Sequence, residues 1–131
     1  MATMSGVEVN LMFPCKPDHP FVYWATLSYV GELIMAGANC YTYDNGFLHA
    51  KGLSIDGKAC CYGTANMDIR SFELNFEVNA MIFDQNIAGE MERIFREDLK
   101  CCTRITKEMY KSRSVWIRFK EQISRLLSPV L

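Results

Sequence analysis

The chain has 131 residues, enough for one domain, and half of them are hydrophobic, so it can bury a core. Its net charge of -1 gives no overall attraction to nucleic acid or to an acidic surface. It contains neither an apolar run of membrane-spanning length nor a signal peptide, so we expect this chain by itself to be soluble or peripheral to a membrane.

The first third of the chain is predicted to form a strand, a helix and a second strand. Residues 6–13 alternate between apolar and polar side chains, which is typical of a strand. The loop that follows contains Asp18, which is suited to cap a helix with Pro20 in its first turn. The helix is expected to end at Gly37, and residues 39–43 follow as a short strand.

A hairpin is predicted next. After a turn at residues 44–46, residues 47–55 form an extended run and residues 58–63 form its partner strand. The intervening Asp56 and Gly57 are a strong signal for a hairpin turn, because both residue types tolerate the left-handed backbone that such a turn requires.

The rest of the chain is predicted to add one strand and two helices. Residues 64–73 are polar and indicate a loop or a short helical turn, and residues 75–83 alternate as a strand. Residues 84–101 and 115–127 carry apolar side chains at helical spacing. This order predicts an α/β fold with a mixed β-sheet flanked by helices. Since the chain opens almost directly on a strand, we expect a single partial domain over residues 1–131 that is incomplete at its N-terminus.

The cysteines and histidines argue against a metal site. The six cysteines include no C-x-x-C pair, and the two histidines stand far apart. Cys60 and Cys61 are neighbours on a predicted strand and point to opposite faces, so they are poor disulfide partners. We expect reduced, mostly buried cysteines and neither a metal nor another cofactor.

His49 and Lys51 stand two residues apart in an extended run, so they are predicted to project to the same side. An imidazole beside an ammonium is unfavourable unless an anion lies between them, and a phosphate group would fill that place. Histidine titrates near neutral pH, so His49 suits nucleophilic or acid–base chemistry, while Lys51 would hold a phosphate oxygen. Thr64 and Asn66 would add hydrogen-bond donors.

Glu77 lies on the predicted strand 75–83, on the face opposite the apolar residues of that strand. We interpret it as the acceptor that orients the His49 imidazole and supports its positive charge. A bare H-x-K pattern is more often structural or part of the surface, and a lone strand glutamate is usually solvated. The functional interpretation therefore depends on the combination of these residues.

Six of these positions form one continuous pattern. His49, Lys51, Asp56, Gly63, Thr64 and Asn66 match, without a gap, the signature H-x-K-x4-D-x6-G-[ST]-x-N. This pattern resembles the HKD motif of the phospholipase D superfamily. Residues 63–84, 13–51 and 118–131 are similar to bacterial cardiolipin synthases in particular. The resemblance covers essentially the whole chain, in register with the C-terminal half of those enzymes.

The resemblance implies a metal-independent phosphatidyl transfer. A histidine of the family attacks a phosphodiester phosphorus and forms a phosphohistidine, and a second histidine protonates the leaving alcohol and then activates the incoming one. In cardiolipin synthases two phosphatidylglycerol molecules give cardiolipin and glycerol. Such enzymes work at the cell membrane, so the resemblance implies the cytoplasmic face of the membrane for a full-length parent.

The same resemblance assigns roles to residues of this chain. It implies that His49 is a catalytic histidine, with the acid–base role usual for a C-terminal motif, and that Lys51, Thr64 and Asn66 bind phosphate. Asp56 completes the motif and is expected to shape the hairpin more than to touch substrate. Glu77 matches the acid that orients the catalytic histidine.

One departure from the family opens alternatives, because such enzymes need two HKD motifs and this chain has one. His19 has no H-x-K pattern and is interpreted as a loop or helix-start residue. The chain is therefore expected to supply one half-site, completed by a missing N-terminal half or by a homodimer partner. The alternatives are a homodimeric single-motif phosphodiesterase or nuclease and a catalytically silent fragment. Without a groove of interleaved basic and aromatic residues, no nucleic-acid partner is expected.

Residues 103–131 form a basic amphipathic tail, with seven Lys and Arg residues against two Glu. Its basic balance indicates either a solvated helix face or a surface that meets a partner. The apolar side chains of its predicted helix are Trp116, Phe119, Ile123, Leu126 and Leu127. This apolar side either packs on the domain core or lies on anionic phospholipid.

Overall fold

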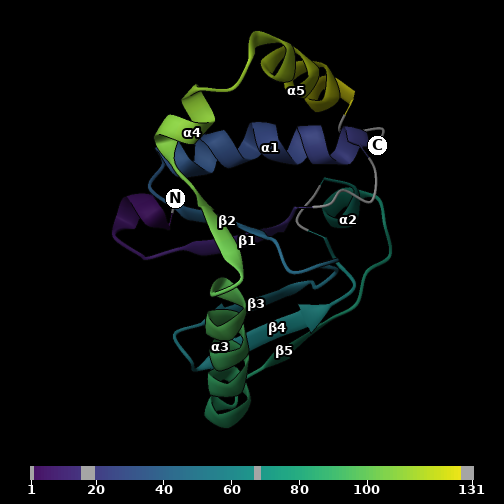
Figure 1. Cartoon of the computed structure of the whole chain (residues 1–131). Helices are drawn as coiled ribbons and strands as arrows, with labels where there is room; N and C mark the ends of the chain where they lie inside the picture. Colours follow the sequence, from purple (N-terminus) through teal and green to yellow (C-terminus); the bar gives the residue numbers. More distant parts are fainter. Residues whose placement is uncertain (1, 16–19, 67–68, 128–131) are drawn as a thin grey trace. The chain divides into compact units, whose positions relative to one another are not determined.

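The computed structural model describes residues 2–15, 20–66 and 69–127 (Figure 1). The chain divides into two compact units, unit 1 with residues 1–48 and 101–131 and unit 2 with residues 49–100. Each unit has a three-stranded sheet of its own. The predicted α/β class is confirmed, but the strands form two small sheets where the sequence predicted one.

The elements follow the predicted order, with additions. Their bounds are β1 (Asn10–Pro14), α1 (Pro20–Met35), β2 (Asn39–Tyr43), β3 (Gly52–Ile55), β4 (Ala59–Gly63), α2 (Ile69–Glu73), β5 (Asn79–Ile82), α3 (Gln85–Leu99), β6 (Cys102–Ile105), α4 (Lys107–Lys111) and α5 (Val115–Leu127), after a short 3-10 turn (Thr3–Ser5). The sequence analysis missed β6 and α4, which are too short to show a period. The proposed cap Asp18 lies outside the described residues.

Unit 1 is built on a mixed sheet in the order β1-β2-β6, with β1 parallel and β6 antiparallel to β2. Helix α1 covers this sheet and buries Val30 and Ile34 against Cys40 of β2, with Leu11 of β1 packed beside them. Burial raises the pKa of the Cys40 thiol to about 11, so this cysteine behaves as a small apolar side chain. In the described part of the chain, no helix is long and apolar enough to cross a membrane.

The cysteines only partly follow the prediction. All six lie among the described residues and none forms a disulfide. Cys40 and Cys60 are buried, as expected, whereas Cys101 is exposed at the turn between α3 and β6. The expectation of a buried side chain is wrong for Cys101.

Helix α5 packs on α1 within unit 1 (Figure 1), and it does so through its polar side. Glu121 is only 2% exposed and forms an ion pair of 2.5 Å with Arg113, which is 16% exposed. The Arg113 guanidinium also donates to the backbone oxygen of Tyr110 and lies over that ring. Arg125 of α5 forms a second ion pair, with Glu32 of α1. Burial raises the pKa of the Glu121 carboxyl, although the charge of Arg113 acts to lower it. Removing the two charges of this ion pair from water therefore costs free energy.

Replacing Arg113 with Met is expected to lower the free energy of unfolding by about 3 kcal/mol, because the buried Glu121 carboxylate loses its partner. The matched control is Arg93→Met, since Arg93 pairs with Glu90 on the exposed surface of α3 and its loss should cost clearly less stability. Urea unfolding of both variants measures the difference. Equal losses would contradict the assigned role of the Arg113–Glu121 pair.

Unit 2 contains an antiparallel sheet in the order β3-β4-β5, with α3 packed on β3 and β4. The predicted hairpin is confirmed: Asp56 and Gly57 have φ angles of 50° and 61°, and the Lys58 amide donates to the Ile55 carbonyl across the turn. Asp84 caps α3 because its side chain accepts hydrogen bonds from the backbone amides of Asn86 and Ile87. The strand predicted over residues 75–83 is shorter, because its ladder pairing begins at Asn79.

Gly63 is the tightest point of this sheet. A Cβ atom at Gly63 would overlap the carbonyl oxygen of Val78 and lie 2.6 Å from the Cα of Asn79. Both obstacles are backbone atoms, so a side chain swing cannot relieve the clash. The glycine of the motif is therefore required by the close approach of β4 and β5.

Replacing Gly63 with Ala is expected to destabilise the chain by about 1–3 kcal/mol, because β5 must move away from β4. The matched control is Gly89→Ala in α3, where a Cβ meets no atom within 4 Å. Alanine should stabilise that helix by about 0.5–1 kcal/mol. Thermal unfolding checks both, and a Gly63→Ala chain as stable as the native one would show that the sheet accommodates the added methyl group.

Candidate active site

The motif residues gather at one end of the unit 2 sheet. Lys51 immediately precedes β3, Thr64 immediately follows β4, and Glu77 lies two residues before β5. Because these strands are antiparallel, the three chain segments meet at the same end of the sheet, which we name the site edge after Lys51, Thr64 and Glu77. The Gly63 amide donates to the Lys51 carbonyl (3.4 Å), and the Thr64 amide donates to the Val78 carbonyl (3.0 Å).

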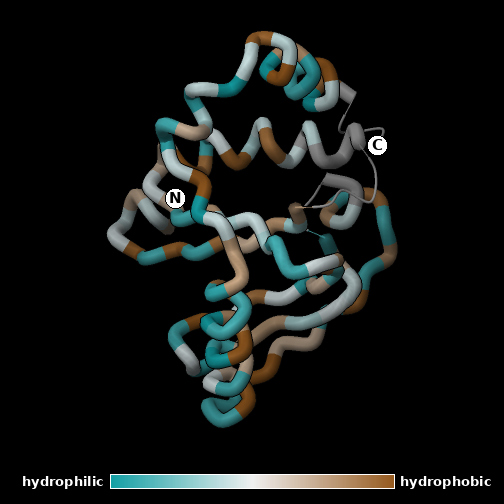
Figure 2. Tube along the Cα trace, in the orientation of Figure 1, coloured by the Kyte–Doolittle hydropathy of each residue, from teal (hydrophilic) through white to brown (hydrophobic). Residues whose placement is uncertain are grey.

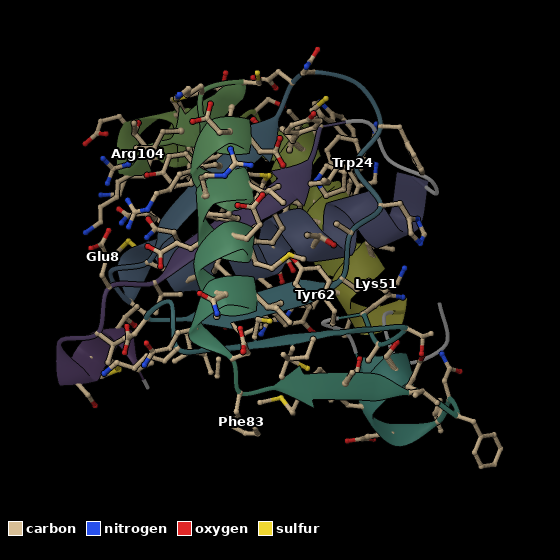
Figure 3. The ribbon with its side chains drawn as sticks, turned by 90° about the horizontal axis from the view of Figure 1, so that it is seen from below. Glu8, Trp24, Lys51, Tyr62, Phe83 and Arg104 are labelled. Atoms are coloured by element: carbon tan, nitrogen blue, oxygen red, sulfur yellow. The ribbon has the colours of Figure 1, made fainter. Side chains whose placement is uncertain are left out.

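His49 and Lys51 project to the same side, as predicted. The Lys51 Nζ lies within hydrogen-bond distance of the His49 Nε2. Which of the two nitrogens donates depends on the tautomer and charge of the imidazole. His49 is exposed and Lys51, labelled in Figure 3, is half-buried. Two nitrogen groups that favour anions thus stand together, although both precede β3 instead of lying within the strand.

Glu77 is held by hydroxyl and amide groups. Its Oε1 accepts hydrogen bonds from the Ser71 hydroxyl (3.0 Å) and the Asn75 amide (3.3 Å). The Thr64 hydroxyl, followed by Ser71 and Asn75 and by the charge of Lys51, holds the pKa of the Glu77 carboxyl below its usual range. Glu77 therefore stays ionised at neutral pH, close enough to Lys51 for their charges to interact. Its proposed contact with the His49 imidazole stays a prediction.

Thr64 connects two strands at the site edge. Its Oγ1 accepts a hydrogen bond of 2.9 Å from the Val78 amide, while its own amide donates to the Val78 carbonyl. This reciprocal pair fixes the backbone next to Glu77. The Thr64 hydroxyl thus already accepts a hydrogen bond within the fold. Its phosphate-binding role stays a prediction.

Ser71 was missed by the sequence analysis. It is only 5% exposed, and its hydroxyl accepts from the Asn66 backbone amide (3.1 Å) and donates to Glu77. The serine thereby links the loop that carries Asn66 to the carboxylate. The signal was present in the tract 63–84, where a serine follows Asn66 by five residues, but only the short helix α2 brings its hydroxyl back to Glu77.

The other two motif side chains have different positions. The Asn66 side chain is exposed in the loop after β4, two residues beyond Thr64. Asp56 lies in the turn between β3 and β4, at the end of the hairpin opposite the site edge. Its position agrees with the expected role in shaping the hairpin, whereas the structure does not bring it together with His49.

Gly52, which follows Lys51, has a structural explanation. It pairs with Tyr62 across β3 and β4, and a Cβ at this position would overlap the Tyr62 ring (Figure 3 labels Tyr62). An aromatic ring packed over a cross-strand glycine stabilises the register of two strands. Burial, followed by the charges of Cys60 and Asp98, raises the pKa of Tyr62. The glycine therefore serves the hairpin that presents His49 and Lys51.

Replacing Ser71 with Ala is expected to raise the pKa of Glu77 toward the ordinary glutamate value of about 4.3, because one hydrogen bond to the carboxylate is lost. Thr64→Val should raise it further, since the Thr64 hydroxyl is the largest cause of the lowered pKa. Carbon-detected NMR titration of the Glu77 carboxyl measures both shifts.

The matched serine control is Ser54→Ala in β3, which should leave the Glu77 titration unchanged. A lowered folded-state pKa stabilises the fold above the unfolded pKa, and this contribution disappears as the pH falls through the folded value. The Ser71→Ala chain should thus lose less stability than the native chain on acidification below about pH 4.3. An identical acid response would contradict the assigned hydrogen bond.

A protein-family model matches the part of the chain that contains these residues. The model described as "Cardiolipin synthase, PLD-like domain" matches residues 1–99. The matched range includes every motif residue from His49 to Asn66 and also Ser71 and Glu77.

Curated relatives extend the similarity to the whole chain. It is 56% identical over 131 residues to the major cardiolipin synthase ClsA of Bacillus subtilis and to cardiolipin synthase 1 of Staphylococcus epidermidis. All of this chain is matched, but only 27% of each relative, in its C-terminal part. The chain thus spans about a quarter of the length of these relatives.

A solved structure supports the fold. The phosphatidylserine synthase of Haemophilus influenzae Rd KW20 matches with a TM-score of 0.68 over 98% of this chain and 35% of its own. The sequence identity is 15%, so this likeness concerns the fold alone.

Proposed function

Because the chain belongs to the family of cardiolipin synthase PLD-like domains, we propose that it supplies one of two half-sites of a phosphatidyltransferase. The reaction converts two phosphatidylglycerol molecules into cardiolipin and glycerol. The observation that carries the proposal is the pairing of His49 with Lys51 at the site edge. A hydrogen-bonded carboxylate, Glu77, belongs to the same edge.

The proposed reaction has two displacements at one phosphorus. A nucleophilic histidine forms a P–N bond as the bond from phosphorus to the glycerol oxygen breaks, and His49 gives its proton to that oxygen. His49 then takes a proton from the hydroxyl of a second phosphatidylglycerol, whose oxygen bonds to phosphorus as the P–N bond breaks. Each step leaves the proton count balanced, and no metal or other cofactor takes part.

The neighbouring side chains support this chemistry by charge. Lys51 provides a fixed positive charge for the equatorial phosphate oxygens, and Asn66 and Thr64 are the proposed hydrogen-bond donors to them. The low pKa of Glu77 favours an ionised carboxylate, which would stabilise the imidazolium form of His49. Ser71 is a positioning residue, since it acts through Glu77 and the Asn66 backbone.

A second histidine must come from outside this single motif. The relatives are almost four times as long as this chain, so a preceding half of the same protein is one proposed source, and a second copy of this chain is the other. We also propose that the full-length protein carries out this reaction at the cytoplasmic face of the cell membrane. A nuclease-like homodimer is disfavoured by the similarity of the whole chain to lipid enzymes.

The test combines solution mass with an assay of glycerol release from phosphatidylglycerol vesicles. We expect turnover only in fractions where two copies associate, because a monomer cannot place two histidines around one phosphorus. His49→Ala should reduce turnover by at least about 100-fold, whereas the matched control His19→Ala should not.

Three results would contradict this proposal. Glycerol release that does not depend on His49 would show that His49 is not the acid–base catalyst. A stable dimer that shows no turnover, even when mixed with the preceding part of the longer relative, would indicate a catalytically silent fragment. Hydrolysis of single-stranded DNA by a dimer that leaves phosphatidylglycerol intact would favour the phosphodiesterase alternative.

A further inference from the structure

The apolar side of α5 faces outward. Five of its side chains are exposed, at 78% for Val115, 75% for Trp116, 57% for Phe119, 40% for Ile123 and 81% for Leu126. They fall within about one third of the helix circumference at the usual 100° per residue. Figure 2 shows hydrophobic and hydrophilic residues alternating along this helix. We name these five residues the exposed face of α5.

The polar side of α5 is fixed inward, so the exposed face cannot turn toward the core. Glu121 and Ser124 are each only 2% exposed against the neighbouring helices. Arg125 pairs with Glu32 and lies 4.8 Å over the Tyr29 ring of α1. These contacts determine the rotation of α5 about its own axis. An amphipathic helix held in this orientation exposes its apolar residues, and such an exposed apolar patch is typical of a surface that binds a partner or a membrane.

Positive charge borders the exposed face. Lys120 and Arg118 are exposed on its two flanks, and Lys107 and Lys111 are exposed on the preceding helix α4. The buried Glu121 is neutralised within the structure by Arg113. The charge that α4 and α5 turn to solvent is thus mainly basic, although the whole chain has a net charge of -1.

We propose that the exposed face of α5 lies on an anionic lipid surface, with the helix parallel to the membrane plane. Trp116 and Phe119 would enter the boundary between headgroups and acyl chains, and Lys120 and Arg118 would contact lipid phosphates. A shallow apolar hollow of about 320 Å³, lined by Val115, Trp116 and Phe119, provides room for part of an acyl chain. The argument concerns α5 alone and is independent of the chemistry at the site edge.

The basic flanks favour a lipid surface over a protein partner for this face. A helix that docks in a protein groove needs apolar anchors and gains little from exposed basic side chains on both flanks. An anionic bilayer gains from each Lys or Arg near its surface, and it also accepts the amphipathic tryptophan ring. Both features are present on one helix here.

The first experiment is sedimentation of the chain with vesicles of phosphatidylglycerol and phosphatidylcholine, compared with vesicles of phosphatidylcholine alone. We expect binding to the anionic vesicles, weakened by added salt. Trp116→Ser combined with Phe119→Ser should weaken this binding at least about 10-fold. Arg118→Gln combined with Lys120→Gln should weaken it by a similar factor. Because all four side chains are exposed, circular dichroism should show the fold intact.

The matched control is Phe83→Ser. Phe83 is 81% exposed after β5 in unit 2 and projects outward in Figure 3, so it tests whether any exposed aromatic residue suffices. Binding of Phe83→Ser should equal that of the native chain. The second measurement uses Trp24→Phe, which leaves Trp116 as the single tryptophan of the chain. Its fluorescence should be quenched by phosphatidylglycerol brominated on the acyl chains.

Four outcomes would overturn the proposal. These are no binding of the native chain to anionic vesicles, equal weakening by Phe83→Ser, and unquenched Trp116 fluorescence in the bound state. The fourth is a solution dimer that Trp116→Ser with Phe119→Ser dissociates, which would assign the exposed face to a second copy. None of these depends on turnover at His49, so the proposal and the proposed function fail separately.

Discussion

The arrangement of the site edge depends on the close approach of β4 and β5 at Gly63. With no Cβ, this residue lets its strand reach the Val78 backbone, and Thr64 then exchanges two hydrogen bonds with Val78. On its other side the Gly63 amide bonds to the Lys51 carbonyl. One residue thus joins the three chain segments that carry the histidine–lysine pair, the loop of Thr64 and Asn66, and the Glu77 carboxylate. A loop sequence alone would not hold these groups together, because each comes from a different strand end.

The sequence predicted the local features of unit 2 and the identity of its motif, because these depend on neighbouring residues. The Asp56–Gly57 turn and the same-side projection of His49 and Lys51 are examples. The role of Ser71 depends instead on how α2 folds back on Glu77, which no short-range pattern encodes. The third strand of the unit 1 sheet is likewise β6, a four-residue strand that pairs with β2 from more than fifty residues away.

Helix α5 shows a different limit of sequence analysis. Its bounds and amphipathic pattern were predicted, since both follow from the spacing of apolar residues. A pattern cannot tell which side faces the core, and apolar burial would be the usual choice. The structure has the opposite orientation, because the Arg113–Glu121 and Arg125–Glu32 pairs fix the polar side against its neighbours.

This orientation of α5 has an energetic consequence for unit 1. Burial of Glu121 raises its pKa, so the pair with Arg113 costs desolvation energy and leaves an apolar face unburied. Glu77, in contrast, has a lowered pKa because hydroxyl and amide groups surround its charged form. The Glu121 carboxylate thus fixes the orientation of α5 at a cost in desolvation energy. The Glu77 carboxylate is instead stabilised as an anion beside Lys51. Such an allocation of charge fits the two proposals, in which the chain contacts phosphate at a reacting group and at a lipid surface. The first requires fixed contacts at short range, which salt screens little, and the second requires exposed cations, which salt screens strongly.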